Sequence, residues 1–137
     1  MGMFYAPSSG GGGGGTGPAG PAGAGVTAWA NVNGAVAPDT DCTIRAGSGF
    51  SSVHMNADLS YTFTFSTPQP DANYCITANC SFDYSSGAPA GGEYVVLHGN
   101  GDGYGFRAPT NTQFTVGASN DSTGKRVAEW LNVAVFR

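Results

Sequence analysis

The chain has 137 residues, of which 40% are hydrophobic and 23 are glycine, so it can bury one core of its own but not two. Only 10% of the residues are charged, and the net charge of −4 with five lysine and arginine residues leaves no basic patch, which argues against nucleic-acid binding. Solubility must rest on serine, threonine, asparagine and glycine, a composition that suits compact β-proteins and fibres.

The amino-terminal segment, residues 1–16, joins a short apolar cluster to a run of glycine. Met3, Phe4 and Tyr5 come first, and residues 10–15 are all glycine. One interpretation is a disordered leader, because glycine has the largest conformational entropy to lose. The other is an anchor whose apolar cluster inserts into a partner's socket. With no lysine, arginine or long apolar run, the segment predicts neither a signal peptide nor membrane insertion, so we expect assembly in a cytoplasm.

Residues 17–25 carry glycine at every third position, with proline or alanine between. The residues that define the repeat are Gly17, Pro18, Gly20, Pro21 and Gly23. This is the collagen repeat, in which only glycine fits at the axis of three chains. Such a segment would extend only about 28 Å at ~3.1 Å per residue, so a trimeric domain would have to hold the chains together. The alternative is a stiff spacer that forms no triple helix.

From Val26 onward the sequence changes to short strand patterns separated by turn residues. The expected strands are 26–33, 42–45, 50–55, 59–65, 74–82, 93–98, 113–116 and 127–136. No stretch has a helical apolar stripe, and turn residues recur about every ten residues. We therefore predict one all-β domain over residues 26–137, an antiparallel, jelly-roll-like sandwich of about eight strands.

The clearest strand is 59–65, where apolar and hydroxyl residues alternate. Its apolar residues are Leu59, Tyr61, Phe63 and Phe65. This period of two predicts one buried and one wet face. Prolines at 68 and 70 should end the strand because they lack an N–H. The turn residues at 56–58 predict a hairpin with strand 50–55.

The terminal strand, 127–136, has apolar residues on both of its faces. One face carries Val127, Leu131, Val133 and Val135, and the other carries Ala128, Trp130, Ala134 and Phe136. A strand that is apolar on both sides is expected to be buried on both sides. We therefore predict that this strand lies near a subunit interface.

The three cysteines, Cys42, Cys75 and Cys80, cannot all pair within one chain. We expect free, buried thiols, with Cys75 and Cys80 on opposite faces of one strand because they are five residues apart. Neither the cysteines nor the isolated His54 and His98 have the spacing of a metal site, and we expect no cofactor.

Groups that could carry catalysis are few. Paired carboxylates for glycan hydrolysis would have to come from loop residues, namely Asp83, Glu93, Asp102 and Asp121. A buried Glu129 would need Arg126 or Arg137 as a structural partner. The sequence thus favours a protein that is not an enzyme. Tyr104 and Phe106 beside Arg107 could stack on sugar rings or fill a gap between subunits.

Several of these segments resemble a small carboxy-terminal domain of bacteriophage tail-fibre and other virion proteins. The segments that carry the resemblance are 28–34 (Ala-Trp-Ala-Asn-Val-Asn-Gly), 44–45 (Ile-Arg), 51–53 (Ser-Ser-Val), 61–65, 70–74 (Pro-Asp-Ala-Asn-Tyr) and, loosely, 131–136. Residues 83–125 match only in being variable. This chain departs from the pattern in an extended first turn at 39–41 and in Cys75, where a small aliphatic residue is expected.

The resemblance implies a trimeric appendage of a virion, and it supports the triple-helix interpretation of residues 17–25. We then expect residues 1–16 to anchor in another virion protein, 17–25 to form a shaft and 26–137 to form a distal knob, in a fibre of the tail or baseplate assembled in the host bacterial cytoplasm. Host-surface glycan would be contacted by loop residues, namely Tyr84, Tyr104, Phe106, Arg107 and Asn120. The alternatives are a capsid decoration or head-fibre protein and a depolymerase of surface polysaccharide.

Overall fold

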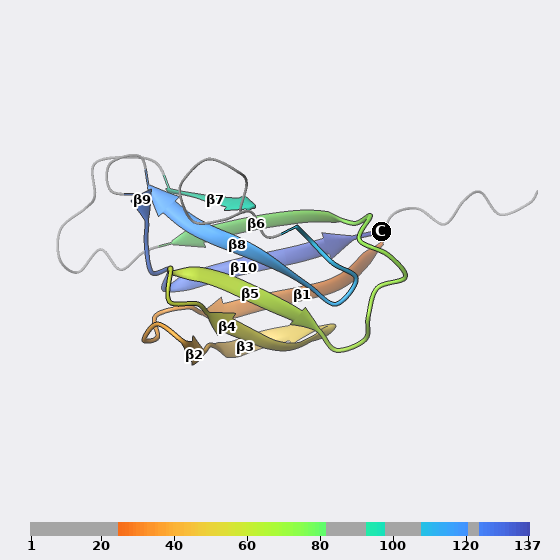
Figure 1. The fold of residues 1–137 in the computed structure, drawn as a ribbon, viewed down its shortest axis with the longest axis horizontal. Helices are drawn as coiled ribbons and strands as arrows, with labels where there is room; N and C mark the ends of the chain where they lie inside the picture. Colours follow the sequence, from red (N-terminus) through yellow and green to blue (C-terminus); the bar gives the residue numbers. More distant parts are fainter. Residues whose placement is uncertain (1–24, 82–92, 98–107, 121–123) are drawn as a thin grey trace, which may run out of the picture.

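The computed structural model describes residues 25–81, 93–97, 108–120 and 124–137, and these residues form ten strands and no helix (Figure 1). The strands are β1 (Val26–Asn33), β2 (Thr40–Asp41), β3 (Thr43–Ser48), β4 (Phe50–Met55), β5 (Ser60–Phe65), β6 (Cys75–Ser81), β7 (Glu93–Leu97), β8 (Gln113–Asn120), β9 (Gly124–Lys125) and β10 (Trp130–Phe136). All pairings are antiparallel, which confirms the predicted all-β class.

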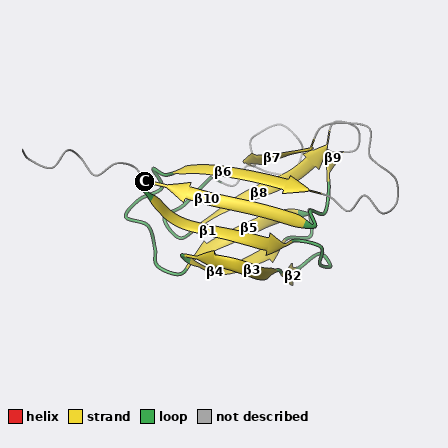
Figure 2. Cartoon of the chain, turned by 180° about the vertical axis from the view of Figure 1, so that it is seen from behind, coloured by secondary structure: helices red, strands yellow, loops and turns green. Residues whose placement is uncertain are grey.

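The strands make two sheets that lie one over the other (Figure 2). The four-stranded sheet has the order β3-β1-β10-β6, and the six-stranded sheet has the order β2-β4-β5-β8-β7 with β9 beside β8. The first strand, β1, thus pairs with the last, β10. Nearer the middle of the sequence, β5 pairs with β8. The chain crosses between the sheets after β1, β2, β3, β5, β6 and β9.

The core lies between the sheets and is built from the inward positions of alternating strands. Its members are Ala28, Ala30, Val32, Cys42, Val53, Met55, Tyr61, Phe63, Phe65, Phe114, Val116, Ala118, Ala128, Leu131, Val133 and Val135. At one end, Phe63 and Phe114 stack with ring centroids 5.2 Å apart, and Phe50 meets the edge of Phe63 at 5.2 Å. Both sheets contribute, so one core holds the described residues together.

The prediction for strand 59–65 is confirmed for three of its four apolar residues. Tyr61, Phe63 and Phe65 are buried, and the strand ends at Phe65 before the prolines. Leu59 instead belongs to the hairpin turn, where its φ of 62° keeps it out of the strand. Ser60 is buried rather than wet, and Asp58 Oδ1 accepts a hydrogen bond from its backbone N–H at 3.1 Å.

The predicted hairpin of β4 and β5 forms through residues 56–59. The Asn56 N–H donates to the Ser60 carbonyl at 2.7 Å, and the Asn56 side-chain amide donates to Ser60 Oγ at 2.9 Å and to Thr62 Oγ1 at 3.0 Å. The register then aligns Met55 with Tyr61 and Val53 with Phe63, which turns both strands' apolar residues toward the core.

Tyr61 joins the two sheets through its hydroxyl. The hydroxyl donates to the Gly34 carbonyl at 3.1 Å and accepts the N–H of Ala128 at 2.8 Å. Burial raises the pKa of Tyr61 to about 12. Gly34 must be glycine here, because a Cβ would lie 2.5 Å from the Ala128 carbonyl oxygen and 2.8 Å from the Tyr61 ring.

The prediction that the terminal strand is buried on both sides is wrong for the single chain. β10 begins at Trp130, so Val127 and Ala128 precede it and do not share its alternation. Leu131, Val133 and Val135 face the core, whereas Trp130 is 45% exposed on the opposite face. The subunit interface expected along this strand stays a prediction.

The chain enters the sandwich at the end where it also leaves it. The Gly25 N–H donates to the Arg137 carbonyl at 2.9 Å, and the Arg137 N–H donates to the Gly25 carbonyl at 3.2 Å. The Arg137 guanidinium also makes a two-pronged ion pair with Asp71, at 2.7 and 2.8 Å. Gly25, the first described residue, therefore lies beside the carboxyl terminus.

The three cysteines, all within the described residues, form no disulfide with one another, as expected, but they are not all buried. Cys42 is buried, and burial raises the pKa of its thiol to about 11. Cys80 packs against the core from β6, whereas Cys75 is exposed on the opposite face of the same strand. The odd spacing thus predicts the two faces correctly, and the expected burial of Cys75 is wrong.

Candidate binding face

The surface of the four-stranded sheet that points away from the core is called here the outer face. Along β1, Ala28, Ala30 and Val32 point inward, so Trp29 and Asn31 point outward. The register then sets the side chains of β1, β10 and β6 in rows across this face, because neighbours in register share a side of the sheet.

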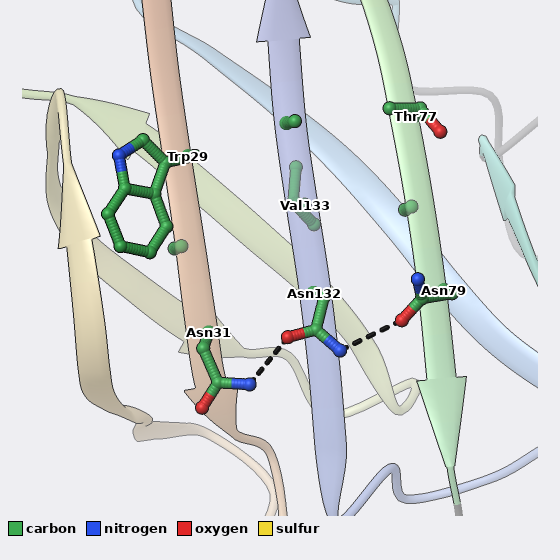
Figure 3. A pocket seen from close by; sticks show the side chains of 9 residues that line it. Trp29, Asn31, Thr77, Asn79, Asn132 and Val133 are labelled. Atoms are coloured by element: carbon green, nitrogen blue, oxygen red, sulfur yellow. Dashed lines mark hydrogen bonds between the residues drawn. The ribbon is translucent and has the colours of Figure 1, made fainter. Parts of the chain in front are cut away.

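One row consists of three asparagines, Asn31, Asn132 and Asn79, which are register partners on β1, β10 and β6. The Asn31 amide donates to Asn132 Oδ1, and the Asn132 amide donates to Asn79 Oδ1 at 2.8 Å (Figure 3). The row leaves an acceptor, Asn31 Oδ1, at one end and a donor, Asn79 Nδ2, at the other. Neither atom has a partner among the described residues.

The next row consists of Trp29, Ala134 and Thr77. Because alanine is the shortest side chain of the three, the face is hollowed over Ala134. Trp29 on β1 and Thr77 on β6 lie on either side of β10 (Figure 3). The hollow has a volume of about 230 Å³. Its lining residues are Trp29, Ala30, Asn31, Thr77, Ala78, Asn79, Asn132, Val133 and Ala134.

The far side of the asparagine row carries a cation held over an aromatic ring. The Arg45 guanidinium lies 3.7 Å from the centroid of the Trp130 ring. It also donates to the carbonyls of Val32 and Glu129, at 3.2 Å each. The arginine charge therefore already interacts with groups of its own chain, while the Trp130 residue remains 45% exposed.

The outer face combines exposed apolar residues with the asparagine row and carries almost no charge. Trp29 and Trp130 are each 45% exposed, and Val26, at the start of β1, is 55% exposed. Arg45 is the single charged residue in the four described strands of this sheet. These strands contain no carboxylate and no imidazole, so the face offers indole surface and amide hydrogen bonds, which are groups that bind rather than groups that transfer protons.

Most residues predicted as functional lie outside the described part of the chain. This holds for the anchor (Met3, Phe4, Tyr5), the shaft (Gly17, Pro18, Gly20, Pro21, Gly23) and four loop residues (Tyr84, Tyr104, Phe106, Arg107). Asn120, expected in a loop, is the last residue of β8. The strand is longer than predicted because residues 116–120 pair with β7, and Asn120 pairs with Glu93 and Gly124.

The candidate catalytic residues are not brought together by the described structure. Asp83, His98, Asp102 and Asp121 lie outside it. His54 Nδ1 lies 2.8 Å from Asp41 on the edge of the six-stranded sheet, at an exposed position. Within the described ranges no group of three or more histidine, cysteine or acidic residues could hold a metal ion.

Glu129 is only partly buried, and it makes no ion pair with the described residues. It contributes backbone bonds instead, because its N–H donates to the Ser81 carbonyl at 3.0 Å and its carbonyl accepts from Arg45. The partner expected for a buried Glu129 is therefore not needed in this structure.

Sequence reasoning missed the outer face. Two short segments, 29–33 and 130–132, indicated this face in the sequence. In each of them a tryptophan is followed two residues later by an asparagine, so both side chains share one face of a strand. The β6 partners, Thr77 and Asn79, could not be found in this way, because only the register between strands brings them beside β10.

Comparisons with models of protein families, with curated proteins and with solved structures found no match. In the described part of the chain there is no helix long and apolar enough to cross a membrane.

Proposed function

We propose that this chain is a structural protein of a bacteriophage virion, a homotrimeric tail or baseplate fibre. Residues 1–16, with Met3, Phe4 and Tyr5, anchor it to another virion protein, and residues 17–25 form a collagen-like shaft. The β-sandwich is a distal knob of jelly-roll type that contacts the host surface. Three linked copies of a weak contact then gain avidity, so no single site has to be tight.

The observation that carries this proposal is the joining of a Gly-X-Y segment to one end of the sandwich. Gly25 is bonded to Arg137 at that end, so the shaft would leave from a single pole. Ser81, Glu93, Asn120 and Gly124 lie toward the opposite pole, as the antiparallel register shows (left in Figure 1). A knob on a shaft needs this polarity, with its attachment at one end and its contact surface at the other.

The strand pairing supports the jelly-roll type. In a jelly roll the chain doubles back on itself, so that outer strands of the sequence pair with each other and inner ones follow in turn. β1 pairs with β10, and β5 pairs with β8. β6 and β7, which lie between β5 and β8 in the sequence, depart from this order, because they are in different sheets.

The experiment that tests the proposal is immunolabelling of whole virions with an antibody raised against residues 26–137. Label at the tip of tail or baseplate fibres is the expected result. Label spread over the head would instead identify a capsid decoration or head-fibre protein. Virions without label would overturn both.

A second experiment measures the mass of the full chain in solution by light scattering. We expect three times the chain mass. Purified trimer should also compete with phage for adsorption to a susceptible host, because the knob would occupy the same surface.

A further inference from the structure

We propose that the outer face of the four-stranded sheet is the surface through which copies of this chain pack together, and that the hollow over Ala134 receives a side chain from a second copy. The inference rests on the trimer of the proposed function, and it identifies the surface through which the three copies would contact one another.

The first argument is the apolar character of the face. A sheet that faces water on one side alternates apolar and polar residues. β10 instead carries three apolar residues outward, Trp130, Ala134 and Phe136, with Asn132 as the one polar residue among them, and Trp29 lies beside Ala134 on β1. The two indoles are each 45% exposed in the single chain. The sequence of β10 is that of a strand covered on both sides, and the single chain covers only one of them.

The second argument is charge, which favours a second copy over a foreign partner. A charged foreign partner would need opposite charges on this face, whereas a second copy brings the same low charge and leaves none unpaired. Arg45 is the one charged residue in these four described strands, and its guanidinium is already held by the Trp130 ring and two carbonyls. The cores of protein interfaces are likewise poor in charge and rich in tryptophan and arginine.

The third argument is position. Gly25 and Arg137 extend β1 and β10, the two central strands of this sheet, to one pole of the sandwich. The segment 17–25 ends at this pole, at Gly25. Chains in a collagen-like bundle run side by side around one axis. Three copies that leave such a bundle therefore start with their β1 strands close together, and β1 carries Trp29 and Asn31 of the outer face.

The asparagine row fits the same arrangement. The acceptor Asn31 Oδ1, on the β1 side of the face, and the donor Asn79 Nδ2, on the β6 side, have no partner among the described residues. Groups of this kind need partners once water is removed. In a threefold ring one side of each copy meets the other side of the next, so the β1 side of one copy can meet the β6 side of its neighbour.

The test compares two arginine substitutions in the full chain by light scattering after size exclusion. Ala134→Arg places a charge and a long side chain in the hollow, and Thr64→Arg places the same group on the outward side of the six-stranded sheet, at a partly buried position. We expect the wild-type chain and the Thr64→Arg chain to be trimers, and the Ala134→Arg chain to lose the trimer.

A second measurement needs no variant, in case Ala134→Arg prevents folding. Hydroxyl-radical footprinting of the intact wild-type chain should show slow oxidation of Trp29 and Trp130, with His54, whose side chain is 39% exposed, as the unprotected control. If the chain is a trimer but Trp29 and Trp130 are oxidised at the rate expected of indoles that are 45% exposed, this inference is wrong while the proposed trimer stands. A monomeric wild-type chain overturns the proposed trimer and this inference with it.

Discussion

Tyr61 shows how one residue can hold two sheets together. Its ring belongs to β5 of the six-stranded sheet, and its hydroxyl bonds Gly34, after β1, and Ala128, before β10. Both bonds are buried, and a buried donor or acceptor that loses its partner costs more than the bond itself contributes.

We expect Tyr61→Phe to lower the free energy of unfolding by about 1–3 kcal/mol, because the Ala128 N–H and the Gly34 carbonyl would both lose a buried partner. Urea unfolding followed by circular dichroism measures this. Tyr74→Phe is the matched control, since the Tyr74 hydroxyl donates to the Thr110 carbonyl at 2.8 Å in an exposed setting, where water can replace it. Equal losses in the two variants would contradict the role given to Tyr61.

The same burial predicts a loss of stability at high pH. Burial raises the pKa of Tyr61 to about 12 from an ordinary value of 10.0. Between these values the unfolded chain has lost the phenol proton and the folded chain keeps it, so stability falls as pH rises through this window. Unfolding measured from pH 9 to pH 12 should show the fall, and it should be smaller in Tyr61→Phe.

At the scale of elements, the sequence predicts well whatever depends on near neighbours in the chain. The alternation of Tyr61, Phe63 and Phe65 predicts the inward face of β5, and the turn residues at 56–58 predict its hairpin. The start of β10 was predicted too early, because the pattern alone cannot show that Val127 and Ala128 lie in a connection. The outer face was missed, because Asn31 meets Asn132 only through a register set across the whole chain.

The connection from β3 to β4 makes a sharp prediction, because one residue, Gly49, carries the chain from one sheet to the other. Its φ is 85°, and a Cβ there would lie 2.7 Å from the Cβ of Ala28. We expect Gly49→Ala to cost about 2–3 kcal/mol, from backbone strain together with overpacking. Ser48→Ala, at the exposed neighbouring position, should stay within about 0.5 kcal/mol of the wild type in the same urea experiment.

At the scale of the whole molecule, the pair of Asp71 and Arg137 fastens the loop after β5 to the carboxyl terminus. Hydrogen bonds from Arg137 hold the pKa of the Asp71 carboxyl well below its usual range. A carboxyl with a lowered pKa contributes stability above its unfolded pKa and loses that contribution as pH falls through the folded value.

We therefore expect Asp71→Asn to lower the melting temperature slightly at pH 7 and pH 5, with a difference from the wild type that closes only under strongly acid conditions. Scanning calorimetry at several pH values measures it. Asp41→Asn, which alters an exposed contact to His54, is the control. A difference that already closes at pH 5 would contradict the assigned pKa direction.

The pairing of β1 with β10 also sets the order in which the molecule can be made. The centre of the four-stranded sheet joins residues 26–33 to residues 130–136, so this sheet cannot close on the ribosome until β10 has been synthesised. Until then β1, with the Gly-X-Y segment directly before it, has only β3 as a pairing strand within this sheet. In the proposed trimer, registration of the three shafts would therefore follow the synthesis of β10 and proceed from the sandwich toward the amino terminus.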